Sequence, residues 1–395
     1  MAKNIIFCAD GTWNGPAQGD GDQPGDPASN VFHLYCCLAG EDVVDPAVFR
    51  AADEQERVLK AADGSKLQVA KYLHGVGDSQ NFLVKALGGA LGAGVITRIV
   101  RGYTFLSRNY EPGDRITILG FSRGAYTARA LAGLVGSKGL LDATRHDLTD
   151  KDEAYRLGCA AWSDYRSAIC ALPGRNWVQA MEGVLDHLPR FFGYGPKVHY
   201  VADVEIHAVA VWDTVGALGI PAYQADNCRL DVFRFCDDVL GAKVHHGLHA
   251  VSIDDQRADF TPTLWKPDPA RIVQMLFPGA HADVGGGYTR ERSESGLSDG
   301  ALKWMIEELQ ALGVQFRAEL PIDIEPIADA PAHQPWLNLP WTLSPRQPRA
   351  GLSGLPAHPS YYERLGKDVF DDPSLTERRR YGPQNGPGPL AVNQP

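Results

Sequence analysis

The sequence places a serine where its hydroxyl would be exposed for nucleophilic attack. Ser122 is the centre of a G-x-S-x-G pattern, G-F-S-R-G at residues 120–124, which directly follows the apolar run I-T-I-L at 116–119. Between a strand and a helix, this pattern is typical of a nucleophile elbow, a strained turn in which small neighbours leave room for the serine. The pattern therefore predicts Ser122 as a nucleophile at the carboxyl end of a strand, with Gly120 and Gly124 as supporting residues.

The acid and the base that such a serine needs occur later in the chain, in the order expected after this elbow. Asp213 follows the strand-like run V-E-I-H-A-V-A-V-W at 204–212, and His281 lies on a glycine-rich loop after the apolar run 272–277. The residues alone leave two alternatives open: Asp213 as a helix N-cap, and His281 as a loop histidine bonded to backbone. Together, the three residues predict a catalytic triad for acyl transfer.

Two other carboxylates compete with Asp213 for the role of the acid. Asp283 lies two residues beyond His281, and we expect it to brace the G-G-G turn at 285–287 as a supporting residue. Asp254 stands in S-I-D-D-Q-R with no obvious strand before it. Asp213 is therefore the predicted acid.

A loop near the amino terminus offers donors for an oxyanion hole. The apolar run 4–9 leads into D-G-T at residues 10–12. The backbone N–H of Gly11 or Thr12, with that of Arg123, would then stabilise the oxyanion of an acyl-transfer intermediate, and Asp10 would support the loop. The D-G-T letters also occur in the D-x-D-G-T motif of haloacid-dehalogenase phosphatases, but Cys8 replaces the nucleophilic aspartate of that motif.

The elements around these residues follow a strand and helix alternation. Helices are predicted at 96–110, at 125–135 after the elbow, and in a region capped by Ser298 or Asp299. The glycine-rich stretch 86–96 is expected to be a tight loop; it lacks the Lys-Ser/Thr of a phosphate-binding loop and is too short to span a bilayer. The group His245, His246 and His249 is interpreted as part of an amphipathic helix, the alternative being a metal site.

The segment between the elbow helix and Asp213 is predicted to be a helical cap insertion at about 140–197. Amphipathic patterns occur at 153–170 and 177–188. Its aromatic residues would either line an acyl pocket or pack the cap onto the sheet; they are Trp162, Trp177, Phe191, Phe192 and Tyr194.

Four sequence blocks resemble a known family. F-C-A-D-G-T-W-N, G-F-S-R-G-A-Y-T-A-R, V-W-D-T-V-G-A and F-P-G-A-H-A-D-V-G-G-G-Y look like the widespread α/β-hydrolase domain family that includes phospholipase effectors of bacterial type VI secretion. The resemblance covers residues 2–312. It implies Ser122 as nucleophile, Asp213 as acid and His281 as base of an ester hydrolase, with phospholipids as the substrate of the best-known members.

The resemblance and the residues together give the expected organisation. The fold class is α/β, an α/β-hydrolase-like domain with a mostly parallel central sheet, helices on both faces, the cap insertion and a Pro-rich C-terminal tail. The catalytic domain is expected at 1–320. The tail at 321–395, which holds about half of the 27 prolines, is expected to be extended, with a short helical or turn element near 361–366, and to pack on that domain.

Composition limits the partners and cofactors. A net charge of −10, from 38 Lys and Arg against 48 Asp and Glu, disfavours nucleic acid and any general attraction to anionic membranes. Seven cysteines without a C-x-x-C pair argue against a disulfide framework and a zinc site. The predicted serine chemistry requires no metal, and no cofactor is expected. The absence of a signal-peptide core predicts a cytoplasmic protein, unless a non-classical, contact-dependent system exports it.

The expected activity is hydrolysis of a lipid ester, with transient membrane contact and an immunity or secretion partner. A small carboxylic ester or a thioester is the alternative substrate within the same chemistry. A catalytically silent binding module on the same fold is the alternative from another class.

Overall fold

A mostly parallel sheet forms the centre of the molecule. The computed structural model describes residues 2–11, 28–43, 54–74, 90–170, 197–215, 238–338, 341–343, 345–370, 378–383 and 385–387. The eight-stranded sheet has the order β10-β9-β8-β5-β1-β4-β3-β2. Its parallel strands are β10 (Ile272–Phe277), β9 (Val244–Ser252), β8 (Ile206–Trp212), β5 (Arg115–Phe121), β1 (Asn4–Ala9) and β4 (Lys66–Leu73). The antiparallel strands β3 (Glu54–Lys60) and β2 (Glu41–Asp42) complete one edge.

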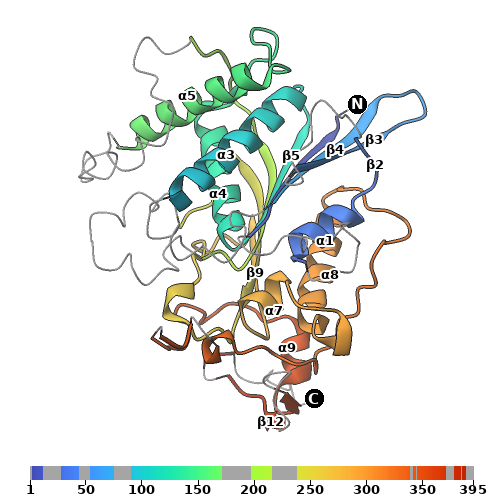
Figure 1. The fold of residues 1–395 in the computed structure, drawn as a ribbon, viewed down its shortest axis with the longest axis vertical. Helices are drawn as coiled ribbons and strands as arrows, with labels where there is room; N and C mark the ends of the chain where they lie inside the picture. The colour runs from blue at the N-terminus through green and yellow to red at the C-terminus, as the bar shows by residue number, and fades with distance from the viewer. Residues whose placement is uncertain are drawn as a thin grey trace.

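Helices cover both faces of this sheet (Figure 1). One face packs against α3 (Ala90–Asn109) and α4 (Arg123–Lys138), and the other against α1 (Asn30–Cys37) and α8 (Gly296–Ala311). The predicted fold class is confirmed: the chain has an α/β fold with a mostly parallel central sheet between two helical layers.

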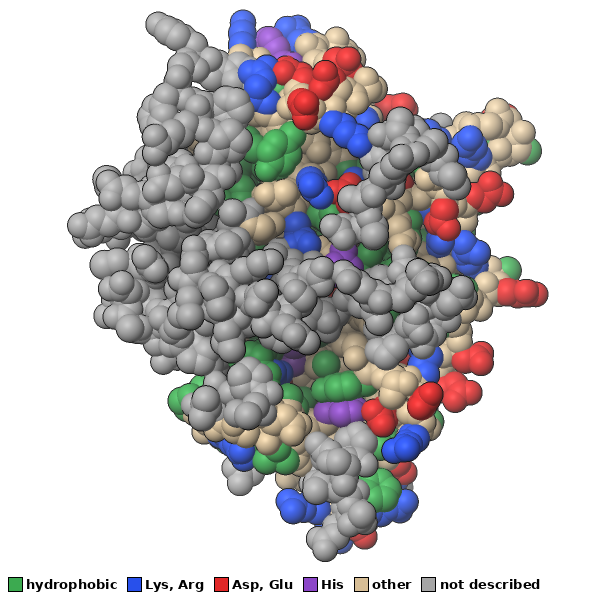
Figure 2. Space-filling model, viewed as in Figure 1, with side chains coloured by type: hydrophobic (Ala, Val, Ile, Leu, Met, Phe, Trp, Pro, Cys, Tyr) green, Lys and Arg blue, Asp and Glu red, His purple; other side chains and the backbone are tan. Residues whose placement is uncertain are grey.

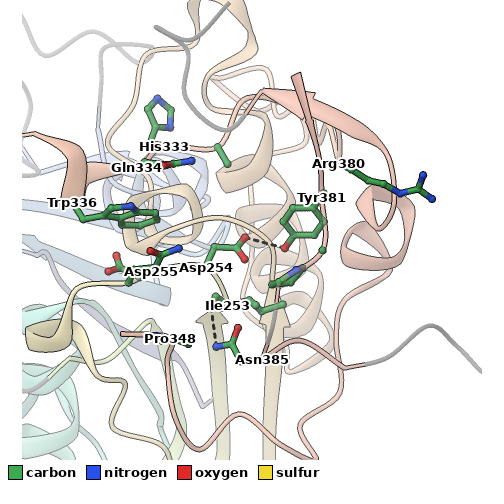
Figure 3. A pocket seen from close by; sticks show the side chains of 14 residues that line it. Ile253, Asp254, Asp255, His333, Gln334, Trp336, Pro348, Arg380, Tyr381 and Asn385 are labelled. Carbon is green, nitrogen blue, oxygen red and sulfur yellow. Dashed lines mark hydrogen bonds between the residues drawn. The ribbon is translucent and has the colours of Figure 1, made fainter. Parts of the chain in front are cut away.

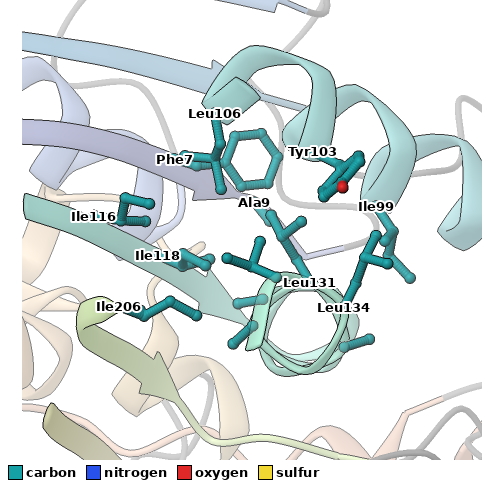
Figure 4. Close-up of a cluster of buried hydrophobic side chains, with 14 of the residues drawn as sticks. Phe7, Ala9, Ile99, Tyr103, Leu106, Ile116, Ile118, Leu131, Leu134 and Ile206 are labelled. Atoms are coloured by element: carbon teal, nitrogen blue, oxygen red, sulfur yellow. The ribbon is translucent and has the colours of Figure 1, made fainter. Parts of the chain in front are cut away.

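Alternation along the strands explains this layering. In β1, Ile5 and Phe7 join the hydrophobic cluster beneath α3 and α4, whereas Ile6 and Cys8 join the cluster beneath α1 and α8. Figure 4 shows Phe7 packed beside Tyr103 of α3 and near Leu131 of α4. A parallel strand covered on both faces has no polar side, which explains why residues 4–9 read as a continuous apolar run.

The insertion after the elbow helix begins with a helix outside the main layers. The helix α5 (Lys151–Cys170) packs on α3 and α4 rather than on the sheet. Trp162 is buried in the core cluster against Tyr165, with ring centroids 5.7 Å apart. Packing rather than substrate contact is therefore the role that the structure gives Trp162. Trp177, Phe191, Phe192 and Tyr194 lie outside the described residues, and the cap over Ser122 stays a prediction.

The carboxyl-terminal segment has a short helix close to the predicted place and, in addition, a small sheet that the sequence did not indicate. It contains α9 (Pro359–Arg364) and a two-stranded sheet of β11 (Asp368–Phe370) and β12 (Arg378–Arg380). A third hydrophobic cluster joins it to the ends of β9 and β10, through Val251, Ile253, Leu276, Leu352, Tyr361, Val369 and Tyr381. The domain boundary at residue 320 itself stays a prediction.

The short elements complete the described chain. The strands β6 (Leu140–Leu141) and β7 (Tyr200–Val201) pair with each other, and α7 (His281–Gly285) follows β10. The single-turn 3₁₀ helices are η3 (Ala258–Phe260), η4 (Glu291–Ser293), η5 (Pro335–Leu337) and η6 (Trp341–Leu343). None of the helices in the described part of the chain is long and apolar enough to cross a lipid bilayer.

Three sequence expectations about elements were wrong. The histidine-containing segment is the strand β9, because pairing with β8 and β10 on its two sides overrides its weak local preference. The helix α8 begins at Gly296 with Ser295 as its N-cap residue, three residues before Ser298 and four before Asp299, the predicted caps. The helix α3 covers Ala90–Asn109, so residues 90–96 of the expected loop are helical, because helix-forming residues flank their glycines. Residues 86–89 lie outside the described chain.

The contact between α4 and β1 makes a stability prediction. A methyl group on Gly124 would collide with the backbone carbonyl oxygens of Ala9 and Asp10. We expect Gly124→Ala to lower the free energy of unfolding by about 2 kcal/mol, measured by urea denaturation. Gly300→Ala is the control: nothing lies within 4 Å of its added methyl, so higher helix propensity should stabilise α8 by about 0.5–1 kcal/mol. Equal effects of the two substitutions would contradict this packing.

Candidate active site

Ser122 occupies the strained corner between β5 and α4. Its φ of 56° and ψ of −121° are unusual for a residue with a side chain. The Ser122 N–H donates to the carbonyl of Trp212 at 3.1 Å, which ties the corner to the neighbouring strand β8. A Cβ on Gly120 would collide with the backbone of Gly124, so the turn needs glycine at that position. The geometry of a nucleophile elbow is thus present at the predicted residue.

Asp213 and His281 are in contact at the same edge of the sheet. The His281 Nδ1 donates to the Asp213 Oδ2 at 2.5 Å, although 68 residues separate them in the sequence. Asp213 is fully buried, and its Oδ1 accepts from the Ser252 N–H at 3.0 Å. Its own N–H donates to the Ala250 carbonyl at 2.7 Å, so β9 holds the aspartate at the end of β8.

A buried arginine completes the surroundings of the carboxylate. Arg349 donates from Nη1 to Asp213 Oδ1 at 2.5 Å and from Nη2 to Oδ2 at 2.8 Å. Burial by itself would raise the pKa of Asp213, but the charge of Arg349 and the hydrogen bonds from His281 and Arg349 outweigh it and hold that pKa far below its usual range. Asp213 is therefore ionised at every pH at which the protein is expected to work.

The imidazole of His281 lies beside the elbow. Its ring is 4.6 Å from that of Phe121, the residue before Ser122, and 5.0 Å from that of Phe260 between centroids. Burial lowers the pKa of His281 below its ordinary value, even though the hydrogen bond and charge of Asp213 act in the opposite direction. The ring is thus neutral at pH 7, with its Nδ1 proton committed to Asp213 and Nε2 left as the basic nitrogen.

The amino-terminal loop reaches the elbow as predicted, with one difference at Gly11. A Cβ on Gly11 would lie 3.3 Å from the Cβ of Ser122, so this backbone borders the serine. The Gly11 N–H, however, donates to its neighbour Asp10 at 2.6 Å. Arg123 begins α4, and N–H groups in a first helical turn have no partner within their helix. Thr12 lies outside the described residues, and all three oxyanion roles stay predictions.

Asp10 is a buried carboxylate beneath the same loop. The Tyr72 hydroxyl donates to it at 2.6 Å. Burial raises the pKa of Asp10 to about 7, against the hydrogen bonds from Ser29, Tyr72 and Gly11. These contacts hold the loop at residues 10 and 11 in place, which is consistent with the supporting role expected for Asp10.

The two rival acids bind other partners. Asp254 accepts from the Gly279 N–H at 2.6 Å and from the Tyr381 hydroxyl at 2.9 Å, and burial raises its pKa to about 6. It follows β9, the strand that the sequence did not reveal. Asp283 accepts from the Ala280 N–H at 2.8 Å and contacts His333. The structure therefore brings Asp213 to the His281 ring.

The loop expected around His281 is partly helical. His281 is the first residue of α7, whose first turn is capped by the Asp283 carboxylate. Gly279 and Gly286, with φ of 102° and 82°, form the turns on either side. These positive φ angles favour glycine and confine the helix to a single short segment.

Several residues lie in the site although no sequence motif indicated them. Arg349 lies in the tail and belongs to no motif. Arg257 and Asp255 form an ion pair at 2.6 Å, and Asp255 also accepts from the His281 N–H at 3.2 Å. His249, which the sequence suggested only as part of a histidine group, accepts from the Thr214 N–H at 3.1 Å beside Asp213. Only strand pairing and tail packing bring these side chains together.

A polar cavity borders the site on the tail side. Its volume is about 350 Å³, and its walls include Asp254, Asp255, His333, Trp336 and Tyr381 (Figure 3). Asp255 connects the cavity wall to the backbone of His281. Within the described chain, no group of three or more His, Cys, Asp or Glu is placed to hold a metal ion.

Comparison with known proteins identifies the family. Residues 3–308 match the family described as "T6SS, Phospholipase effector Tle1-like, catalytic domain". The chain belongs to this family. It is also similar to the uncharacterized protein YEL023C of Saccharomyces cerevisiae, with 27% identity over 282 residues, which cover 70% of this chain and 34% of the yeast protein. The chain thus spans about a third of the length of that curated relative.

Two solved structures are similar to this Tle1-like chain. An uncharacterized protein from Pseudomonas aeruginosa has 19% identity and a TM-score of 0.43, over 80% of this chain and 46% of the other. The second structure, of the Tle1 effector bound to the VgrG spike from the Type 6 secretion system, has 17% identity and a TM-score of 0.34. It covers 73% of this chain and 52% of the other.

The contact between Asp283 and His333 gives a pH prediction for stability. His333 Nδ1 lies 2.6 Å from Asp283, and its Nε2 lies 3.5 Å from Glu294. Burial lowers the pKa of His333, but these two carboxylates outweigh it and raise the pKa above its usual value. A raised folded-state pKa stabilises the protein below the unfolded-state pKa, and this contribution is lost as pH rises through the folded-state pKa.

We therefore expect His333→Gln to lower the free energy of unfolding by about 1 kcal/mol near pH 6 and by less near pH 9, measured by urea denaturation. His245→Gln is the control, because its contact with Glu205 is half-exposed and should contribute little at either pH. If the loss of unfolding free energy in His333→Gln instead grew with pH, protonated His333 would not be the stabilising form.

Proposed function

We propose that this Tle1-like chain is a serine hydrolase that cleaves a lipid ester through an acyl-enzyme. The observation that carries the proposal is the 2.5 Å contact between Asp213 and His281 beside the strained Ser122 elbow. Three segments distant in the sequence meet there, and their residue types are those that nucleophilic acyl transfer requires.

The geometry supports a definite order of proton transfers. Since Nδ1 of His281 donates to Asp213, Nε2 is the nitrogen that takes the proton from the Ser122 hydroxyl as its oxygen attacks the ester carbonyl. The resulting imidazolium is stabilised by the ionised Asp213 and gives its proton to the leaving alcohol when the ester bond breaks. Water then attacks the acyl-enzyme with His281 again acting as base, which releases the acid and restores Ser122.

The start of α4 is suited to the negative charge that develops during the attack. Ser122 immediately precedes the helix, so the positive end of its dipole faces the reacting carbonyl. The N–H of Arg123, with that of Gly11 or Thr12, is the proposed oxyanion donor set. For Gly11 this role requires its N–H to exchange the Asp10 carboxylate for the substrate oxygen.

The family membership supports a lipid ester as the substrate class. A membrane-embedded ester would have to be reached by transient contact with a lipid surface. Acidic and basic side chains are intermixed over the described part of the face in Figure 2, and the chain carries a net charge of −10. Contact through apolar side chains rather than charge is therefore proposed. Because the matched family is one of type VI secretion effectors, we propose a component of a secretion spike as the partner, as VgrG is for the Tle1 effector. An immunity protein is a second proposed partner, on the family membership alone.

The assignment of Ser122 is tested by removing its hydroxyl. Ser122→Ala should lower kcat for ester hydrolysis on the order of a thousandfold or more and leave the circular dichroism spectrum unchanged. Ser107→Ala is the control: Ser107 is also buried, but its hydroxyl donates to the Tyr103 carbonyl and accepts from the Leu141 N–H, away from the elbow. Near wild-type hydrolysis by Ser122→Ala would remove the proposed mechanism.

The substrate class is tested with esters of graded length. If the acyl chain is buried, each methylene adds about 0.8 kcal/mol of binding, so kcat/KM should rise from short to medium chains. Rates on phospholipid vesicles should exceed those on monomeric esters and depend little on salt. A maximum at acetyl esters, with no gain on vesicles, would leave a small-ester hydrolase, and no turnover at all would favour a binding module.

A further inference from the structure

We infer that Arg349, from the carboxyl-terminal segment, is a positioning residue for the active site: it fixes the Asp213 carboxylate that orients His281. The family match ends at residue 308, so this arginine comes from outside the matched catalytic domain. The inference deepens the proposed serine-hydrolase function and rests on it for the kinetic part of its test.

Arg349 and Asp213 form a bidentate contact. Both terminal nitrogens of Arg349 donate to Asp213, one to each carboxylate oxygen, at 2.5 and 2.8 Å. The Nη1 also donates to the Ser252 carbonyl at 3.0 Å. A planar guanidinium in this arrangement fixes the plane of the carboxylate as well as its charge, which a lysine cannot do.

The backbone around Arg349 is itself held against the catalytic domain. The Gln347 N–H donates to the Gln256 carbonyl at 2.8 Å, and the Ala258 N–H donates to the Pro345 carbonyl at 3.1 Å. The Arg349 carbonyl accepts from the Asn385 side chain at 2.9 Å. The arginine therefore enters the site from a segment whose position is fixed on both sides.

Burial makes this partner necessary. Asp213 is fully buried and the Arg349 side chain is 1% exposed, so water cannot replace the guanidinium. An unpaired carboxylate in such a place takes up a proton or moves toward another donor. Either change would loosen the hydrogen bond to His281 Nδ1 and disturb the tautomer that leaves Nε2 basic.

Other charges around the pair must be considered for any pH effect. Asp255 and Arg257 form their own ion pair beside His281, and His249 is a buried neutral ring beside Asp213. Burial lowers the pKa of His249 to about 3, so this ring does not titrate in the working range. Asp255 and Asp254 act on Arg349 only as more distant charges, without a hydrogen bond to it. Arg349 is the cation in direct contact with Asp213 among the described residues.

Removing the guanidinium has a predictable direction. Without Arg349, the pKa of Asp213 rises, and the negative charge that remains attracts a proton more strongly to His281. Both changes raise the pH at which the pair takes up the proton that inactivates the base. In Arg349→Met, the acid limb of the kcat/KM profile should therefore move up by about one pH unit, and kcat should fall on the order of 10- to 100-fold with little change in KM.

A second readout does not depend on turnover. In the 395-residue chain labelled with ¹⁵N-histidine, the Nδ1 proton of His281 should give a strongly downfield NMR resonance because it bonds a carboxylate at 2.5 Å. His281→Gln assigns it. In Arg349→Met this resonance should shift or broaden. Arg349→Lys keeps the charge but not the bidentate geometry, so its acid limb should stay near wild type while kcat falls severalfold, by less than tenfold, and the resonance shifts less than in Arg349→Met.

Arg364→Met is the matched control. Arg364 is another buried arginine of the same segment, but it donates to the Ala328 and Ala330 carbonyls at 2.8 and 2.6 Å. Its loss should lower Tm without moving the acid limb or the His281 resonance. If Arg364→Met moved the acid limb or the His281 resonance by as much as Arg349→Met, Arg349 would only help to hold the segment in place, and the inference would be overturned.

The outcomes separate the inference from the function it rests on. A folded Arg349→Met with a wild-type pH profile and resonance overturns the inference and leaves the hydrolase intact. If Arg349→Met does not fold, an Arg349→Lys identical to wild type in kcat, acid limb and resonance overturns it. A resonance that responds to Arg349→Met in a protein that hydrolyses no ester supports the positioning role and contradicts the proposed function.

Discussion

The buried carboxylate of Asp213 is the point on which the site depends. It accepts hydrogen bonds from the Ser252 N–H at the end of β9, from His281 at the start of α7 and from Arg349 of the carboxyl-terminal segment. Since a fully buried carboxylate needs its partners to stay ionised, the position of each of these segments is tied to the others. The end of β9, the start of α7 and the carboxyl-terminal segment are thus all connected through this one carboxylate.

The elbow imposes a second constraint, on backbone rather than charge. The sharp turn at Ser122 brings Gly124 so close to the end of β1 that no side chain fits there. That proximity also brings the Gly11 backbone against the serine. The nucleophile, the positive end of α4 and the amino-terminal loop therefore meet because β1 and β5 are adjacent parallel strands.

Local patterns in the sequence were sufficient for much of this arrangement. The runs before Asp10 and His281 are strands at the predicted residues, Asn4–Ala9 and Ile272–Phe277. The first is a parallel strand buried along its whole length, which leaves a nearly continuous apolar signal. The second is a partly buried edge strand that is still mostly apolar. The contact between Asp213 and His281 agrees with the predicted triad, which was inferred from the residue types, from the apolar runs before them and from their order after Ser122. Their catalytic roles stay predictions.

The missed features depend on contacts between distant segments. The histidines of β9 gave no strand pattern, and its pairing on both sides decided its conformation. Arg349 stands in a proline-rich stretch whose path is set by packing on β9 and β10 through residues such as Leu352 and Tyr361. The apolar residues of this stretch follow no helix or strand periodicity, so the sequence could not predict that its arginine contacts Asp213.

Labelling with a fluorophosphonate, followed by peptide mapping, tests the central claim most directly. The reagent phosphonylates only a serine whose hydroxyl is activated by a neighbouring base. The account predicts a single adduct on the peptide that contains Ser122, with labelling greatly slowed in His281→Gln. No adduct on the folded wild-type protein, or an adduct on another serine, would contradict it.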